Sequence, residues 1–176
     1  MRFVATPLAG AVVVELEPAR DERGFFARTF DRDGFLAAGL SGEFVQSSVS
    51  YNIRRGTLRG LHFQTAPHEE PKLVRCSRGA IHDVIVDLRR GSATHCRWFA
   101  VELSADNRRA LYVPPGFAHG FQTLADDTEI FYAMAVAYVP AAARGVRWND
   151  SAFGIAWPIS PPVMSERDAG YPDYQP

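Results

Sequence analysis

The sequence has little cysteine and no long apolar run, and both shortages narrow the class of protein. Its only cysteines among 176 residues are Cys76 and Cys96. Two thiols without a secretory leader indicate a reduced protein of the cytoplasm, not a scaffold held by disulfides. The first residues, MRFVATPLAG, lack the apolar core of a signal peptide, and no segment approaches the roughly 20 apolar residues of a membrane helix. We therefore expect a cytoplasmic protein with no membrane partner.

Excess charge of either sign is absent as well. The formal net charge is −1, so the chain carries no general basic field for nucleic acid. Hydrophobic residues make up 47% of the chain, a fraction that argues against disorder. No internal repeat, low-complexity tract or linker interrupts it. The length therefore suits one domain, residues 1–176, with its own core and no nucleic-acid partner.

Short β-branched and aromatic runs do recur, separated by Gly, Pro, Asn and Asp. They predict strands at residues 11–16, 24–30, 44–51, 58–64, 72–76, 81–88, 98–103, 110–113, 121–124 and 128–139. The alanines of the last run would also permit a helix, but this run lies within a series of strands. A charged turn is expected at residues 20–24 and a short helix at 31–40, capped by Asp31 or Asp33. Many short strands favour an antiparallel sandwich or jelly-roll barrel, over which residues 148–176 would wrap as an extension.

The run at residues 58–64 places two polar side chains on one face of its strand. His62 and Gln64 alternate with apolar residues, which is the period of two of a strand. Lys72 opens the following run, in which alternate residues again change face. Neighbouring strands that present His, Lys and Arg would form a concave cationic surface with one group that titrates near neutral pH. Such a surface suits anionic ligands and proton transfer.

Other polar residues could join His62. His119 opens a strand after the tight turn PPG and could face His62 across the mouth of the barrel. Tyr132 shares a strand face with apolar residues, where a tyrosine most often packs with its hydroxyl satisfied. Asp83 is a candidate partner for a pocket histidine. Asp168 lies in the segment SERDAG, where a carboxylate is most often a surface charge.

Together these residues could invert a carbon next to a ketone. A general base such as His62 would remove the α-proton, and Lys72, with Arg59 or His119, would stabilise the enolate oxygen. Tyr132 would then return a proton to the opposite face. A carboxylate on the far imidazole nitrogen would fix the tautomer of the base and stabilise the imidazolium.

Several motifs in one order give the chain a resemblance to a known family. They are DERGFF at residues 21–26, FVQ at 44–46, LRGLHFQ at 58–64, KLVRC at 72–76, DVIVDLR at 83–89, PPGFAHGF at 114–121, WND at 148–150 and GIAWP at 154–158. On these motifs the chain resembles the dTDP-4-dehydrorhamnose 3,5-epimerases over nearly its whole length. The resemblance implies an all-β, cupin-type jelly roll and a homodimer with strands exchanged between subunits. It also implies that neither a cofactor nor a metal takes part.

The reaction of this family supplies the expected function. The resemblance implies inversion of the two carbons next to the 4-keto group of dTDP-4-dehydro-6-deoxy-D-glucose. The product would be dTDP-4-dehydro-L-rhamnose, a precursor for carbohydrates such as the lipopolysaccharide O-antigen. The resemblance assigns the base to His62, the acid to Tyr132 and the paired carboxylate to Asp168. By the same route it assigns substrate binding to Arg23, Gln46, Ser47, Ser48, Arg59, Lys72, His119 and Arg167.

The chain also departs from the family pattern. Arg28 and Ala143 stand where the family often has Glu. Ser47 and Ser48 stand where it often has Asp-Asn, and Ala133 where a Lys commonly follows the acid. We expect these positions to lie near the ligand and away from the proposed catalytic pair. The departures leave open a 3-only or 5-only epimerase that acts on a different nucleotide sugar.

Two other classes remain open. Metal-dependent cupins bind an ion through a His-x-His pair, a Glu and a distant His, and this chain offers His62, His68, Glu69 and His119. Gln64 breaks the His-x-His pair, so the ligand set is incomplete. A non-catalytic module that binds a sugar nucleotide would keep the cationic pocket without needing a base.

Overall fold

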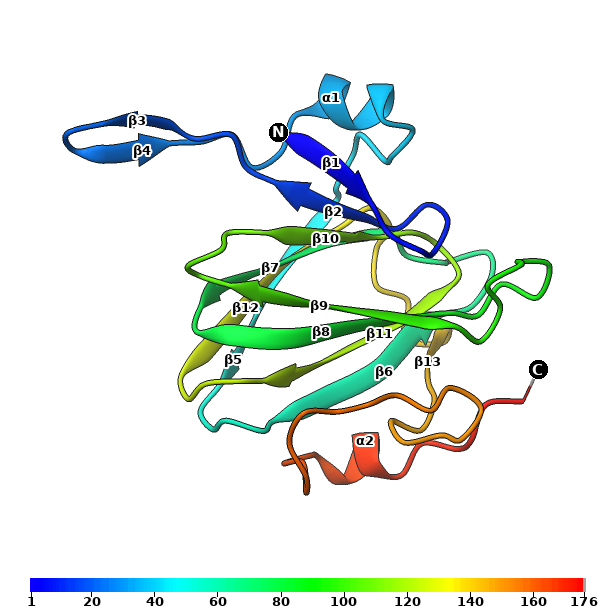
Figure 1. The fold of residues 1–176 in the computed structure, drawn as a ribbon. Helices are drawn as coiled ribbons and strands as arrows, with labels where there is room; N and C mark the ends of the chain where they lie inside the picture. Colours follow the sequence, from blue (N-terminus) through cyan, green and yellow to red (C-terminus); the bar gives the residue numbers. More distant parts are fainter. Residues whose placement is uncertain (176) are drawn as a thin grey trace.

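The computed structural model describes residues 1–175; Pro176, the last residue of the expected domain, lies outside them. Two antiparallel sheets face one another and form a jelly-roll barrel of the cupin type (Figure 1). The expected all-β fold is therefore confirmed. The six-stranded sheet has the order β1 (Arg2–Ala5), β2 (Val12–Glu15), β10 (Ala110–Val113), β7 (Lys72–Arg78), β12 (Thr128–Met134) and β5 (Gln46–Asn52). The five-stranded sheet has the order β13 (Ala143–Gly145), β6 (Leu58–Gln64), β11 (Phe117–Thr123), β8 (Ala80–Asp87) and β9 (Trp98–Ser104).

Two further features lie outside these sheets. A small hairpin of β3 (Ala19–Asp21) and β4 (Gly24–Phe26) projects away from the barrel. The C-terminal segment, coloured orange to red in Figure 1, runs beside β6 and carries helix α2 (Glu166–Ala169). The expected C-terminal extension is therefore present, and it brings α2 against β6.

Hydrophobic side chains from both sheets fill the space between them. Val74 and Ile130 come from the six-stranded sheet, and Ile85 and Phe121 from the five-stranded one; each is at most 2% exposed. A second cluster lies on the outer face of the six-stranded sheet, around Phe35 of helix α1 (Arg32–Ala37). The six-stranded sheet is thus covered on both faces near α1.

Neighbouring strands β7 and β12 show the alternation that the sequence predicts. Val74 and Tyr132 are register partners and both pack toward the inner core. Leu73 and Ala133, one residue along, pack in the outer cluster. Because side chains two residues apart share a face, Lys72 lies on the same inner face as Tyr132.

Strands β6 and β11 come very close to each other at Gly60. A Cβ atom added to Gly60 would lie 2.6 Å from the Cα of Gly120, and Gly60 has a φ of +130°. Only glycine fits such an approach. The register of the pair shifts here between His119 and Phe121. The N–H of Gly60 instead donates to the carboxylate of Asp168, at 3.2 Å.

Both helices begin at a side-chain cap. Asp31, one of the two expected caps of α1, accepts a hydrogen bond from the N–H of Gly34 at 2.9 Å. Ser165 caps α2 and accepts from the N–H of Asp168 at 3.1 Å. Such caps satisfy N–H groups that have no partner within the helix. Asp168 is therefore part of a short helix, not of the exposed loop that its sequence context suggests.

Several predicted boundaries are wrong. The run at residues 24–30 forms only β4, which pairs with β3. The charged turn expected at residues 20–24 is present but shorter, at Glu22 and Arg23. The run at 128–139 leaves the sheet after Met134, where the N–H of Ala135 bonds to the carbonyl of Pro71. Strand β11 begins at Phe117, because the residues before 121 already pair with β8. Strands β1 and β13 and helix α2 are not predicted from the sequence.

No helix within residues 1–175 has the length and apolar character needed to cross a membrane.

Candidate active site

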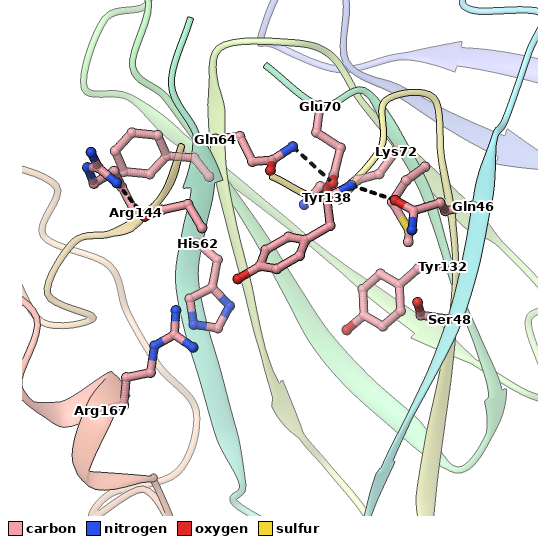
Figure 2. Close-up of a pocket in the computed structure, with 13 residues that line it drawn as sticks. Gln46, Ser48, His62, Gln64, Glu70, Lys72, Tyr132, Tyr138, Arg144 and Arg167 are labelled. Carbon is pink, nitrogen blue, oxygen red and sulfur yellow. Dashed lines mark hydrogen bonds and ion pairs between the residues drawn. The ribbon is translucent and has the colours of Figure 1, made fainter. Parts of the chain in front are cut away.

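A cavity of about 470 Å³ lies between the two sheets at one end of the barrel (Figure 2). Strands of both sheets, two loops and helix α2 contribute to it. Its lining side chains are Gln46, Ser48, His62, Phe63, Gln64, Glu70, Lys72, Tyr132, Met134, Tyr138, Ala143, Arg144 and Arg167. His62 on β6 and Lys72 on β7 belong to different sheets, so the prediction that their strands are neighbours is wrong. The loop at residues 65–71 crosses from one sheet to the other, and the two side chains therefore lie on different walls of the cavity.

His62 is held by a buried carboxylate. Its Nε2 lies 2.9 Å from Oδ1 of Asp168, and the other carboxylate oxygen accepts from Gly60. Burial raises the pKa of Asp168, but the hydrogen bond and charge of His62, the Gly60 amide and the nearby Arg167 lower the pKa below its ordinary value of 3.8. An ionised carboxylate fixes the proton of the imidazole on Nε2 and leaves Nδ1 free to accept one.

Tyr132 stands on the wall opposite His62, and the two side chains face the same space (Figure 2). Burial raises the pKa of Tyr132 well above 10, the charge of Asp83 adds to this, and Arg59 opposes it. The phenol therefore stays protonated at neutral pH and can donate a proton. Two opposed groups, one able to accept and one able to donate a proton, are what inversion of a carbon requires.

Lys72 is paired within the cavity. Its Nζ lies 2.8 Å from Oε1 of Glu70, and the side chains are 12% and 10% exposed. The surface expected to be cationic therefore carries an ion pair at this point. The exposed cations Arg144 and Arg167 lie at the rim, on the side of His62.

His119 and Arg59 lie close to the cavity but do not line it. His119 pairs with His62 on the adjacent strand, so the expected position across the mouth of the barrel is wrong. Nε2 of His119 lies 2.8 Å from Oδ1 of the fully buried Asp83, and its ring meets the edge of Tyr132 at a centroid distance of 6.1 Å. Arg59 donates to Asn52 at 2.7 Å. His119 therefore contacts Tyr132, and the charge of Arg59 acts on it.

Two more predicted binding residues, Arg23 and Ser47, also lie outside the cavity of this chain. Arg23 is at the tip of the β3–β4 hairpin, where it pairs with Asp21 and its side chain is 82% exposed. Ser47 points away from the cavity, because Gln46 and Ser48 occupy the inward positions of β5. Of the predicted binding residues, Gln46, Ser48, Lys72 and Arg167 do line it.

The departures from the family pattern are not all near the cavity. Ala143 lines it, and so does Ser48. Arg28 instead bonds to Asp31 at the start of α1, at 3.0 Å, and Ala133 packs in the outer cluster. Arg28, Ala133 and Ser47 therefore do not line the cavity of this chain.

Several residues that line the cavity were not predicted from the sequence. Glu70 and Tyr138 come from loops, whose shape no periodicity predicts. Met134 could have been found, since it shares the inner face of β12 with Tyr132. Arg144 lies in β13, a strand of three residues without a recognisable pattern.

The residues considered for a metal site do not gather. His62 contacts Asp168, His119 contacts Asp83, and Glu69 lines a different cavity beside Arg89. Within residues 1–175, no three His, Cys, Asp or Glu side chains come together as a metal centre. The donor set of a metal-dependent cupin is thus not assembled by this chain.

Fold and site together define a class: a cupin jelly roll with a histidine and a tyrosine on opposite walls of a polar cavity. Comparison with known proteins gives the family. The sequence profile of the family described as dTDP-4-dehydrorhamnose 3,5-epimerase matches residues 5–175. The chain belongs to this family.

Individual relatives agree with this assignment. A dTDP-4-dehydrorhamnose 3,5-epimerase of Methanothermobacter thermautotrophicus is 44% identical over 175 residues, which cover 97% of this chain and 92% of the relative. The crystal structure of the Bacillus anthracis enzyme of the same name, with TDP and PPi bound, matches with a TM-score of 0.95 and 41% identity, over 98% and 99% of the two chains. A 3'-monoepimerase of Streptomyces bikiniensis in complex with dTDP-quinovose matches with a TM-score of 0.88 and 35% identity, over 96% and 85%.

Proposed function

We propose that this chain is an isomerase that converts dTDP-4-dehydro-6-deoxy-D-glucose into dTDP-4-dehydro-L-rhamnose. The observation that carries the proposal is the pair of His62 and Tyr132 on opposite walls of one cavity, in a member of this epimerase family. The single domain of residues 1–176 would act in the cytoplasm, in the synthesis of dTDP-rhamnose.

The geometry supports a mechanism of proton transfer. His62, oriented by Asp168, takes the proton from a carbon next to the keto group, and the electron pair moves onto the keto oxygen. The ammonium of Lys72 stabilises the resulting enolate. Tyr132 delivers its proton to the opposite face of the carbon, which completes the inversion. These steps use side chains alone and need neither a cofactor nor a metal.

Rim cations support a diphosphate ligand. Arg167 and Arg144 are exposed beside the cavity, and guanidinium groups bind phosphate oxygens in a bidentate manner. The relatives from Bacillus and Streptomyces contain TDP and dTDP-quinovose. A dTDP-linked sugar is therefore the proposed substrate, with Gln46, Ser48, Arg59 and His119 as further binding or supporting residues.

We also propose that the active form is a homodimer. The β3–β4 hairpin projects from the barrel and carries Arg23 and the 76% exposed Phe26 (Figure 1). The edge strand β5 presents Val49 and Tyr51 outward, at 58% and 45% exposure. A second copy that covers the exposed side chains of the hairpin and of β5 would bury apolar surface. Its hairpin could then bring Arg23 to the cavity of its partner.

A second candidate function follows from one of the comparisons. A 3'-monoepimerase shares the fold at 35% identity, and Ala143 and Ser48 alter the cavity relative to the family pattern. Inversion at a single carbon would use the same base and acid.

Turnover on a panel of nucleotide sugars tests the proposal. The purified chain is incubated with dTDP-, CDP-, UDP- and GDP-linked 4-keto-6-deoxy sugars, and products are followed by proton NMR. We expect conversion of the dTDP sugar with inversion at both carbons. Inversion at one carbon would establish the monoepimerase, and no conversion of any sugar would overturn the proposal.

A further inference from the structure

Lys72 is the only lysine of the chain; all its other basic side chains apart from histidine are arginines. It lies in the cavity with a side chain that is 12% exposed, whereas the other cations of the lining, Arg144 and Arg167, are exposed. A lysine ammonium is a compact charge on a flexible stem, and an arginine is a rigid planar fork. The compact ammonium lies on the inner face that also carries Tyr132, and it can be kept at one position there only if its stem is restrained.

A carboxylate of the same cavity supplies the restraint. Oε1 of Glu70 lies 2.8 Å from Nζ of Lys72, and its side chain is 10% exposed. Bulk water screens such a shielded pair much less than a surface pair. Glu70 occupies one of the three N–H donors of the ammonium and leaves the others for a ligand.

Glu70 is itself enclosed by a polar frame. Nε2 of Gln64 lies 3.5 Å from its other carboxylate oxygen and donates to the carbonyl of His68 at 3.0 Å. The amide oxygen of Gln64 accepts from the N–H of Val139 at 2.6 Å. Gln64, which is 6% exposed, thus joins the loop of Glu70 to the loop that follows β12. The position of Glu70 is set by the fold and not by a ligand.

We propose that Glu70 is a positioning residue for Lys72 in the epimerisation proposed above, on which this inference rests. The carboxylate holds the ammonium on the inner face that it shares with Tyr132, so that a free N–H meets the enolate oxygen. Misplacement of a reacting group by about 1 Å can cost roughly a hundredfold in rate. Replacement of Glu70 should therefore slow the chemical step more than it weakens binding.

Steady-state kinetics of four variants test the role. Glu70→Gln should lower kcat about tenfold or more while KM for the dTDP sugar stays within about twofold. In the Lys72→Met background the same change should have no further effect on kcat. Glu69→Gln, the matched control in the neighbouring position, should behave as wild type. A Glu70→Gln variant with unchanged kcat, with a raised KM alone, or with the same loss of kcat in both backgrounds would overturn the proposal.

A spectroscopic readout does not depend on turnover. Protein labelled with ¹⁵N-lysine gives one side-chain ammonium signal, because Lys72 is the only lysine. Its protons should exchange with water several-fold faster in Glu70→Gln than in wild type and Glu69→Gln. Equal exchange rates of the ammonium protons in all three proteins would show that Glu70 does not restrain Lys72. If wild type converts no sugar but the exchange differs, the proposed epimerisation fails while the positioning of Lys72 by Glu70 stands.

Discussion

The carboxylate of Asp168 controls the proposed base through one hydrogen bond to Nε2 of His62. Asp168→Asn keeps the size of the side chain but removes the charge that stabilises the imidazolium. We expect kcat to fall by about 10²–10⁴-fold, as in other His–Asp pairs, with little change in dTDP affinity. Turnover assays measure kcat, and calorimetry measures the affinity for dTDP. Asp173→Asn on the exposed tail is the control. A kcat within about twofold of wild type would contradict the role.

Replacement of Tyr132 should stop inversion of the carbon without stopping removal of its proton. Tyr132→Phe keeps the ring against His119 but removes the proton donor. We expect deuterium exchange from solvent to continue at one or both carbons while net inversion falls about a hundredfold or more. Proton NMR follows both processes, and Tyr112→Phe, in the outer cluster, is the control. If Tyr132→Phe inverts the carbon at the same rate as the wild type, Tyr132 is not the proton donor.

At this scale the sequence shows which residues share a strand face but not which faces meet. The alternation around Lys72 and Tyr132 is correct, because strand geometry alone determines it. Asp168 could be linked to His62 only through the family resemblance, since 106 residues separate them. The pairing of Glu70 with Lys72 depends on the shape of a loop containing Pro67 and Pro71. Periodicity carries no information about such a loop.

At the scale of elements, the β3–β4 hairpin pairs with neither of the two large sheets, although the ring of Phe25 meets the guanidinium of Arg108. If it enters the cavity of a second copy, Arg23→Gln should raise KM about tenfold by loss of a phosphate contact. Arg20→Gln in the same hairpin is the control, and its KM should equal that of the wild type. Mixed dimers of Arg23→Gln with His62→Ala should regain activity, because one of their two sites has both native residues. No regain of activity on mixing would contradict an exchanged hairpin.

Elements with a strong local pattern were predictable, and those set by distant contacts were not. Strand β10 matches its predicted bounds, and α1 begins at a predicted cap. Strand β13 has three residues and exists only because Gly145 and its neighbours pair with β6. Helix α2 has four residues and is held by contacts to β6, which no window of the sequence reveals.

At the scale of the whole molecule, a half-buried histidine should couple stability to pH. Nε2 of His82 is buried without a hydrogen-bond partner among the described residues, and its ring packs against Trp157. Burial lowers the pKa of His82 below its ordinary 6.5, and the charge of Asp83 offsets this only in part. The unfolded chain therefore binds more protons below pH 6.5, so this stability is present above pH 6.5 and is lost as the pH falls toward the lowered pKa.

Urea unfolding at several pH values measures this coupling. Between about pH 7 and 5 the free energy of unfolding should fall, with His82 contributing at most about 1.4 kcal/mol per pH unit. His82→Asn should flatten the dependence, and His68→Asn, in a loop, should leave it unchanged. Equal slopes in wild type and His82→Asn would contradict the assignment.

Solvent exchange next to the ketone tests the central claim most directly. The native chain and His62→Ala are each incubated in deuterium oxide with dTDP-4-dehydro-6-deoxy-D-glucose, and proton NMR records the signals of the two carbons that flank the keto group. We predict deuterium at both carbons with the native chain and at neither with His62→Ala, although both proteins bind dTDP. A native chain that incorporates no deuterium, or a His62→Ala variant that exchanges at the native rate, would contradict catalysis by this histidine.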